Sequence, residues 1–283
     1  MEWRGLTADE LEAQYNPRRA VPDFEIHFKA YKERSEQTRA KHLGRYDIRY
    51  GTGPLQTYDL YPGAKPGAPL FVIVHGGYWR GLDKNLHSFM IEPYLAAGCA
   101  VANINYDLCP AVTVDQIVRQ TQEAVAHLAK HAGEYNADAG KLVLFGHSAG
   151  AHLAAAAYAL PWPADLGTRP DPAGLALVSG VYDLEPVLHI SVNQEVRLDG
   201  AMAARNSLLR QPLKLKARTL VAVGGLEPQA WLDQSLAFHA ACRDAGTPAH
   251  AMTIAGTNHF SVLYAASDAR QPLTGAILEM LRG

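Results

Sequence analysis

Apolar segments typical of buried strands alternate with segments typical of helices over most of this chain. Six apolar runs follow one another: "PLFVIVHGG", "CAVANINYDL", "KLVLFGHS", "LALVSGVYDL", "TLVAVGGLE" and "AHAMTIAGTNH". Helices are predicted between and after them, near Lys84–Ala97, Thr113–Gly133, Ala149–Leu160, Gln229–Ala245 and Asp268–Arg282. Continuous apolar strands separated by helices are typical of parallel sheets that are covered on both faces. The pattern therefore predicts an α/β protein with a mostly parallel central sheet.

The first part of the chain has a different character. The segments "ADELEAQYN" and "FEIHFKAYKERSEQTRAKH" are charged and have helical spacing, so residues 1–43 are predicted to form a helical segment. The segments "RYDIRYG" and "LQTYDLYP" alternate with period two and predict a hairpin across Gly51, Gly53 and Pro54. Because no internal repeat or Gly/Ser linker interrupts the chain, we expect one domain over residues 1–283.

Composition excludes several kinds of partner. The formal net charge of -2 provides no basic excess for nucleic acid or an anionic membrane. The N-terminus lacks the apolar stretch of a secretory signal, and the longest apolar run, Leu153–Leu160, is too short to span a bilayer. Three cysteines without a C-x-x-C motif favour a reducing compartment. We therefore expect a cytoplasmic protein that binds neither nucleic acid nor membranes.

The residues that follow the predicted strands are the first candidates for a functional site. In parallel α/β sheets, sites form beyond the carboxyl ends of the strands. After "LVLF" comes a G-x-S-x-G motif with Ser148 between Gly146 and Gly150. A serine on such a tight strand-to-helix turn is held out for nucleophilic attack, and glycines leave space around it. The alternative is a serine that only caps the following helix.

A second glycine-containing turn, "HGGYWR", follows the strand "FVIV". Its backbone can direct N–H groups toward a substrate oxygen, so we expect Gly77, Tyr78 and Ala149 to provide oxyanion donors. An ordinary Gly-Gly turn is the alternative. His75 precedes the turn and is expected to be a structural, hydrogen-bonded histidine rather than a base.

Two further strand ends carry an acid and a histidine. Glu227 follows "TLVAVGGL" and His259 follows "MTIAGTN". The chain order Ser148, Glu227, His259 is the order nucleophile, acid, base of α/β-hydrolases. A helix-start carboxylate is the alternative role for Glu227. The competing acids Asp233 and Asp244 and the competing base His250 are less suitably placed, because the acids fall inside a predicted helix and His250 begins a strand.

No motif predicts a cofactor or a metal. His127 and His131 have i, i+4 spacing, but the glutamate of H-E-x-x-H and a third ligand are missing. Neither G-x-x-x-x-G-K-[ST] nor G-x-G-x-x-G occurs. We therefore expect an enzyme that needs neither a cofactor nor a metal ion.

Several segments together resemble one known family. The segments "HGGYWR", "NYDLCP", "GHSAGAHLAA", "SGVYDLEPV", "LDQS" and "GTNHFSV" are similar to the kynurenine formamidase (arylformamidase) branch of the α/β-hydrolases, close to the hormone-sensitive-lipase-like esterases. The resemblance implies a sheet of about eight strands and a cover over the site formed by the N-terminal segment. It implies Ser148 as nucleophile, Glu227 as acid and His259 as base, with oxyanion donors from Gly77, Tyr78 and Ala149. It also implies a role in tryptophan catabolism.

These observations predict a serine hydrolase that cleaves a small, aromatic formamide or ester, with N-formylkynurenine as the first candidate substrate. A general short-chain carboxylesterase is the alternative, and a catalytically silent binding module is a remote one. Trp79 and Tyr182, with Tyr78 and the aromatic lead-in of Tyr15, Phe24 and Phe28, are candidates for the wall of a substrate pocket. Packing in the core is the alternative for each of them. A homodimer is a working assumption, since the sequence does not decide the oligomeric state.

Overall fold

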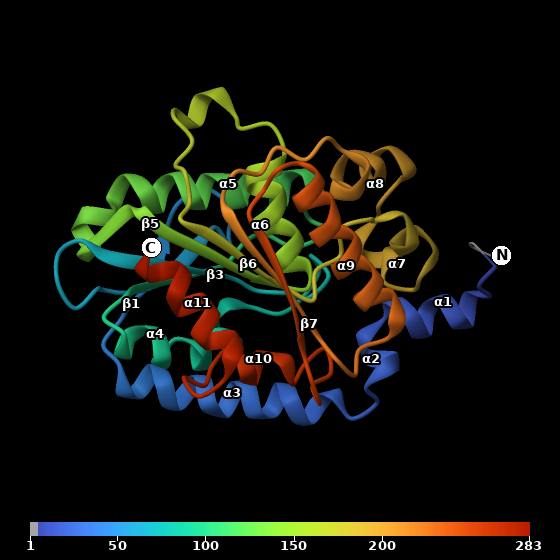
Figure 1. Cartoon of the computed structure of the whole chain (residues 1–283), viewed down its shortest axis with the longest axis horizontal. Coiled ribbons are helices and arrows are strands. Elements are labelled where there is room, and N and C mark those ends of the chain that lie inside the picture. The colour runs from blue at the N-terminus through green and yellow to red at the C-terminus, as the bar shows by residue number, and fades with distance from the viewer. Residues whose placement is uncertain (1–4) are drawn as a thin grey trace.

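The computed structural model describes residues 5–283, so the first four residues of the predicted N-terminal segment lie outside the described part. An eight-stranded sheet in the order β1-β2-β4-β3-β5-β6-β7-β8 forms its centre (Figure 1). The strands are β1 (Arg45–Arg49), β2 (Thr57–Tyr61), β3 (Ala68–Val74), β4 (Ala100–Ile104), β5 (Ala137–His147), β6 (Gly174–Val178), β7 (Arg218–Gly224) and β8 (Ala249–Ile254). The predicted mostly parallel sheet is confirmed.

The predicted hairpin is confirmed as well. Strand β1 pairs antiparallel with β2, and Ile48 lies opposite Tyr58. Strand β2 also runs antiparallel to β4, whereas every pairing from β4 across to β8 is parallel. The carboxyl ends of the parallel strands therefore meet at one edge of the sheet.

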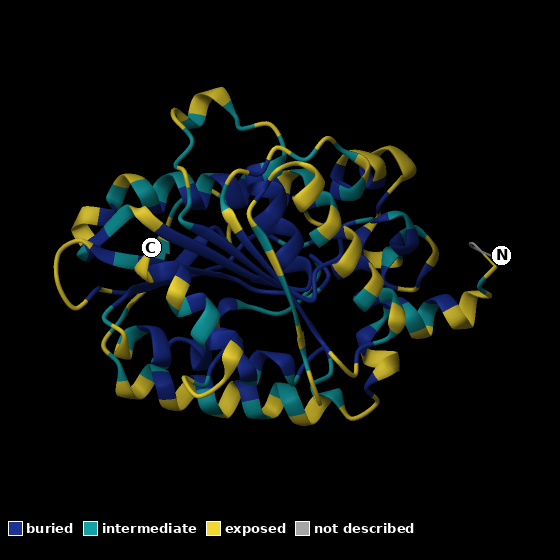
Figure 2. Cartoon of the chain, viewed as in Figure 1, coloured by how far each residue is buried: buried dark blue, intermediate teal, exposed yellow. Residues whose placement is uncertain are grey.

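Alternation of side chains along the central strands produces a separate core on each face of the sheet. Leu70, Val72 and Val74 of β3 belong to one core, whereas Phe71 and Ile73 belong to the other. Helices α5 (Val114–His131), α6 (Ala149–Ala159) and α9 (Gln229–Asp244) cover the first core. Helices α3 (Phe24–Lys41), α4 (Glu92–Ala96), α10 (Val262–Ala265) and α11 (Pro272–Arg282) cover the second. Figure 2 shows the central strands buried between these layers, whereas the edge strands β1 and β8 are partly exposed.

Most predicted helices are confirmed, and one is interrupted. Thr113 begins α5 with a capping box to Gln116, close to the predicted start. The segment predicted as one helix over Lys84–Ala97 is instead a 3-10 helix, η1 (Lys84–Met90), followed by α4. Pro93 explains the break, because proline lacks the N–H that a continuous helix needs and fits only the first turn of a new one. None of the helices in residues 5–283 is long and apolar enough to cross a membrane.

Two segments outside the strand–helix alternation lie at the carboxyl edge of the sheet. The first contains α1 (Ala8–Tyr15) and α2 (Pro17–Ala20), which precede α3. The second connects β6 to β7 through η4 (Glu185–His189), α7 (Asn193–Val196), α8 (Gly200–Asn206) and η5 (Leu208–Arg210). Helix α1 packs against η4 and α9, so the two segments meet (Figure 1). The second segment is not predicted by the sequence, because its helices are too short to show a period.

The crossing of α6 over the end of β3 leads to a stability prediction. A Cβ atom at Gly150 would lie 2.1 Å from the carbonyl oxygen of Val74 and 2.6 Å from that of His75. Backbone atoms cannot move aside as a flexible side chain can. We therefore expect Gly150→Ala to lower the free energy of unfolding by about 2–3 kcal/mol in equilibrium urea denaturation.

The matched control is Gly275→Ala in α11, where an added Cβ meets no atom within 4 Å. Alanine has the higher helix propensity, so this variant should gain about 0.5–1 kcal/mol. If Gly150→Ala were as stable as the unmodified protein, the close crossing described above would be wrong.

Candidate active site

Ser148 occupies a strained turn between β5 and α6. Its φ of 56° and ψ of −123° are rare for a residue with a side chain. The Ser148 N–H donates a hydrogen bond of 2.8 Å to the carbonyl of Val178, which fixes the turn against β6. A Cβ at Gly146 would lie 2.2 Å from the carbonyl oxygen of Gly150, so the motif's glycines are required for space. Ser148 stands at the N-cap position of α6, but its side chain makes no capping hydrogen bond, which disfavours the purely structural alternative.

Glu227 and His259 form a buried carboxylate–imidazole pair. The Nδ1 atom of His259 lies 2.6 Å from Oε2 of Glu227. Because a carboxylate only accepts hydrogen bonds, Nδ1 carries the hydrogen and Nε2 is left to accept a proton. The other carboxylate oxygen, Oε1, accepts from the N–H of Gly224 at 2.8 Å and from the hydroxyl of Ser179 at 2.5 Å. The structure therefore brings the predicted acid and base together at the ends of β7 and β8.

His259 and Ser148 line the same pocket, although no hydrogen bond joins their side chains within residues 5–283. The distance between a catalytic base and its nucleophile is often longer in the absence of substrate than in its presence. The loop that carries His259 is held from two sides: Nε2 of His147 lies 2.8 Å from the carbonyl oxygen of His259, and the hydroxyl of Tyr31 donates to the carbonyl of Phe260. Burial, and to a lesser degree His259, lowers the pKa of His147 well below its usual value, so His147 is neutral.

Sequence reasoning missed three of these supporting residues. His147 lies inside the G-x-S-x-G motif, yet the motif does not specify the residue before the serine. Ser179 directly follows the strand "LALV", so a search of every strand end could have found it. Nothing in the sequence links Tyr31 to the loop that it holds.

The turn after β3 presents backbone N–H groups to this site. Gly77, Tyr78 and Trp79 have φ values of 112°, 51° and 57°. In the described part of the chain, the N–H groups of Gly77, Tyr78 and Ala149 donate to no protein acceptor. Tyr78 donates its hydroxyl hydrogen to the carbonyl of Tyr15 at 2.5 Å, which ties the turn to α1. Three unpaired N–H groups are therefore available where an oxyanion hole is predicted.

His75, just before this turn, occupies a structural position. Its Nδ1 lies 2.7 Å from the carbonyl oxygen of Gly76, and its Nε2 lies 2.8 Å from Oδ1 of Asn105. Its ring stacks on Tyr106, with 4.3 Å between the centroids. Both nitrogens are occupied, so His75 is unsuited to act as a base.

The pocket that Ser148 and His259 line is narrow, with a free volume of about 60 Å³. Its apolar wall comes from α3, from the loop after β3, from the segment between β6 and β7, and from the residues that follow β8. The residues that form this wall are Phe28, Tyr31, Leu82, Val192, Phe260 and Leu263. The N-terminal segment thus contributes to the cover, as the resemblance implies.

Trp79 and Tyr182 are not part of this wall, contrary to the prediction. Trp79 is fully buried, and its ring centroid lies 5.2 Å from that of His152. Tyr182 is also fully buried and stacks on Phe238 at 3.8 Å. Both side chains belong to the core on the face of the sheet that α5, α6 and α9 cover. Of the aromatic lead-in only Phe28 reaches the pocket, while Phe24 packs behind it at 5.4 Å.

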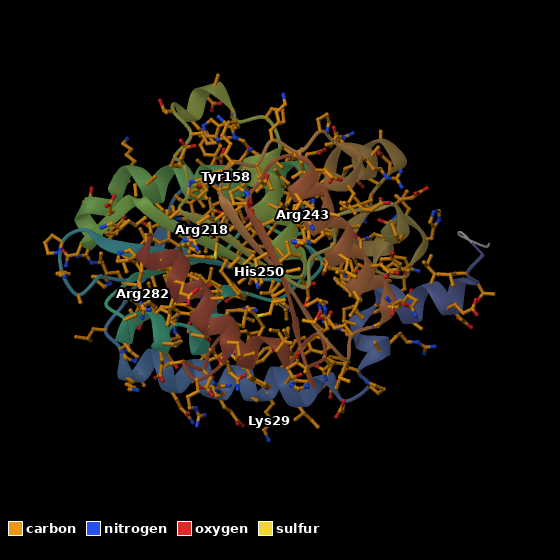
Figure 3. The ribbon with its side chains drawn as sticks, in the orientation of Figure 1. Lys29, Tyr158, Arg218, Arg243, His250 and Arg282 are labelled. Carbon is orange, nitrogen blue, oxygen red and sulfur yellow. The ribbon has the colours of Figure 1, made fainter. Side chains whose placement is uncertain are left out.

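The competing acids and base lie away from the pocket. Asp233 and Asp244 are exposed on α9, and His250 is exposed on β8 (Figure 3). The rings of His127 and His131 are 4.4 Å apart, but within residues 5–283 no group of three metal-binding side chains exists.

The sheet order and the strained serine turn define an α/β-hydrolase, and comparisons with known proteins agree. The BD-FAE family profile matches residues 58–160. Kynurenine formamidases of Danio rerio and Salmo salar are each 31% identical to this chain, and the alignments cover 99% of it and 98% of each relative. A crystal structure from Silicibacter sp. TM1040, provisionally described as a thioesterase, is 30% identical with a TM-score of 0.85 over 95% of this chain and 99% of its own.

The chain therefore belongs to the kynurenine formamidase family. The resemblance seen in the sequence is confirmed, and the protein is a hydrolase of the arylformamidase or esterase type.

The buried Glu227–His259 pair leads to a prediction about turnover. Glu227→Gln removes the negative charge that orients and stabilises the imidazolium, so kcat for p-nitrophenyl acetate should fall at least about 100-fold with little change in KM. Glu227→Asp should keep part of the activity, because a carboxylate remains. The control is Asp233→Asn on the exposed face of α9, which should leave kcat unchanged. An inactive Asp233→Asn or Asp244→Asn variant beside an active Glu227→Gln variant would refute the choice of acid.

Proposed function

We propose that the protein is a serine hydrolase in which Ser148, His259 and Glu227 act together. His259 accepts the proton of the Ser148 hydroxyl as its oxygen attacks the substrate carbonyl, and the N–H groups of Gly77, Tyr78 and Ala149 stabilise the oxyanion. His259 then gives the proton to the leaving group, and the acyl group stays on Ser148. Water, activated by the same imidazole, releases the acid and restores the serine. The observation that carries this proposal is the Glu227–His259 hydrogen bond in the pocket that contains Ser148.

We propose an aromatic formamide as the substrate, with N-formylkynurenine as the first candidate. Membership of the kynurenine formamidase family supports this choice. The narrow pocket supports it too, because a formyl group is the smallest acyl group. The aromatic side chains of Phe28, Tyr31 and Phe260 form a surface suited to an aromatic leaving group. Hydrolysis of N-formylkynurenine would place the protein in tryptophan catabolism.

A short-chain carboxylesterase is the second candidate. The proposed mechanism does not depend on an amide nitrogen, and the same narrow pocket accepts the short acyl group of an ester such as an acetate. Activity on esters and on formamides can therefore coexist, and their ratio decides which function is primary.

Ser148→Ala tests the mechanism. We expect the variant to lose turnover of p-nitrophenyl acetate and labelling by a fluorophosphonate probe, because both require the serine hydroxyl. Circular dichroism should show that the variant is folded. EDTA should not affect the unmodified enzyme. Turnover by Ser148→Ala at the rate of the unmodified protein would refute the serine mechanism, and an unmodified protein that the probe fails to label would favour a silent binding module.

The substrate is tested by comparing kcat/KM for N-formylkynurenine with kcat/KM for short p-nitrophenyl esters. If formamide hydrolysis is the primary function, N-formylkynurenine should be cleaved at least as efficiently as the best ester, although the ester has the better leaving group. An ester preferred by several orders of magnitude would establish the carboxylesterase instead.

A further inference from the structure

Two arginines line the pocket of Ser148 and His259. Arg18 belongs to α2 in the N-terminal segment, and Arg80 belongs to the turn after β3. The N–H of Arg80 donates to the carbonyl of Gly77 at 3.1 Å, so Arg80 is part of the same turn as the proposed oxyanion donors. Two separate segments of the chain thus bring positive charge to one pocket.

The positive charge of these arginines is only partly neutralised. Arg80 pairs through Nη1 with Oε1 of Glu195 at 2.5 Å, but its buried Nε donates to no acceptor within residues 5–283. The guanidinium of Arg18 forms no ion pair in the same range, and its contacts are the rings of Phe24 at 5.1 Å and Phe28 at 5.8 Å.

Other charged groups near the arginines do not neutralise the remaining positive charge. Glu25 and Glu195 attract Arg18 only weakly, and the pKa of Arg18 is lowered, first by burial and then by the like charge of Arg80. The pocket histidine His87 adds no charge, since burial and its neighbour His75 lower its pKa to about 3. The pocket therefore holds two guanidinium groups beside one directly paired carboxylate.

We propose that Arg18 and Arg80 bind a carboxylate of the substrate in the pocket that Ser148 and His259 line. A guanidinium presents parallel N–H donors that match the two oxygens of a carboxylate. This inference rests on the proposed function and narrows it to aromatic formamides or esters that carry an acidic group. The reacting group meets Ser148, the ring meets Phe28 and Phe260, and the carboxylate meets the arginines.

Formanilide and its three carboxylated analogues, 2-, 3- and 4-formamidobenzoate, test the proposal in the full-length enzyme. We expect kcat/KM for the best formamidobenzoate to exceed that for formanilide at least about tenfold. The preference should shrink as ionic strength rises, because salt screens the charges. Arg18→Gln and Arg80→Gln should reduce this preference about tenfold, mainly by raising KM for the carboxylated substrate.

Two controls separate recognition of the carboxylate from damage to the fold. Arg19→Gln changes the neighbouring arginine, which is exposed like Arg18 but does not line the pocket, and should keep the full preference. Arg80→Lys keeps the positive charge and should restore part of the preference lost in Arg80→Gln. Equal loss of activity on neutral and carboxylated substrates in both glutamine variants, or no preference in the unmodified enzyme, would overturn the proposal.

A binding measurement distinguishes failure of this inference from failure of the proposed function. Calorimetric titration of the Ser148→Ala protein with the formamidobenzoates does not require turnover. If formamides are not cleaved but a formamidobenzoate binds at least about tenfold more tightly to Ser148→Ala than to the Ser148→Ala, Arg18→Gln double variant, the carboxylate site stands and formamidase activity fails. If formanilide is cleaved and the two proteins bind the acid equally, formamidase activity stands and the carboxylate site fails.

Discussion

The contact between Gly150 and the end of β3 is the constraint on which the site depends. Because no side chain separates α6 from the carbonyls of Val74 and His75, the first turn of the helix lies directly against the strand. The start of α6 also lies close to the turn after β3, since a Cβ at Gly76 would lie 3.2 Å from the Cβ of Ser148. This close packing forces Ser148 into its strained backbone conformation, which the hydrogen bond to Val178 maintains. Backbone packing thus positions Ser148 and the proposed oxyanion donors before any substrate binds.

The order of strands β6, β7 and β8 in the sheet explains how Glu227 and His259 are positioned. Strands β6, β7 and β8 are neighbours in the sheet, and their carboxyl ends lead to Ser179, Glu227 and His259 in turn. Hydrogen bonds join these three side chains in the same order. A buried carboxylate is costly unless it is fully hydrogen-bonded. Ser179, His259 and the N–H of Gly224 together provide that compensation, so Glu227 remains in position without contact with solvent.

The features predicted correctly from the sequence are those that depend on hydrophobic periodicity or on the residues that follow each strand. The strands and most helices follow from local hydrophobic patterns. Ser148, Glu227 and His259 were found because each follows a predicted strand, and a parallel sheet brings the ends of its strands together. The helices between β6 and β7 are too short to show such a pattern. Apolar spacing alone predicted one helix over Lys84–Ala97, but Pro93 divides that segment in two. Aromatic character did not distinguish the core positions of Trp79 and Tyr182 from a pocket wall. Arg18 and Arg80 meet only because the chain folds, so no spacing in the sequence connects them.

The N-terminal segment has a consequence for how such an enzyme can diversify. Its residues reach the pocket from outside the strand–helix framework, and the hydrogen bond from Tyr78 to the carbonyl of Tyr15 is a direct polar link between that segment and the turn after β3. The side chains that would perform the chemistry follow the carboxyl ends of β5, β7 and β8, whereas Arg18 lies on α2 and Phe28 and Tyr31 lie on α3. Selection can therefore alter which molecules are accepted by changing the residues of α2 and α3 that line the pocket, provided that Tyr31 keeps its hydrogen bond to the loop that carries His259.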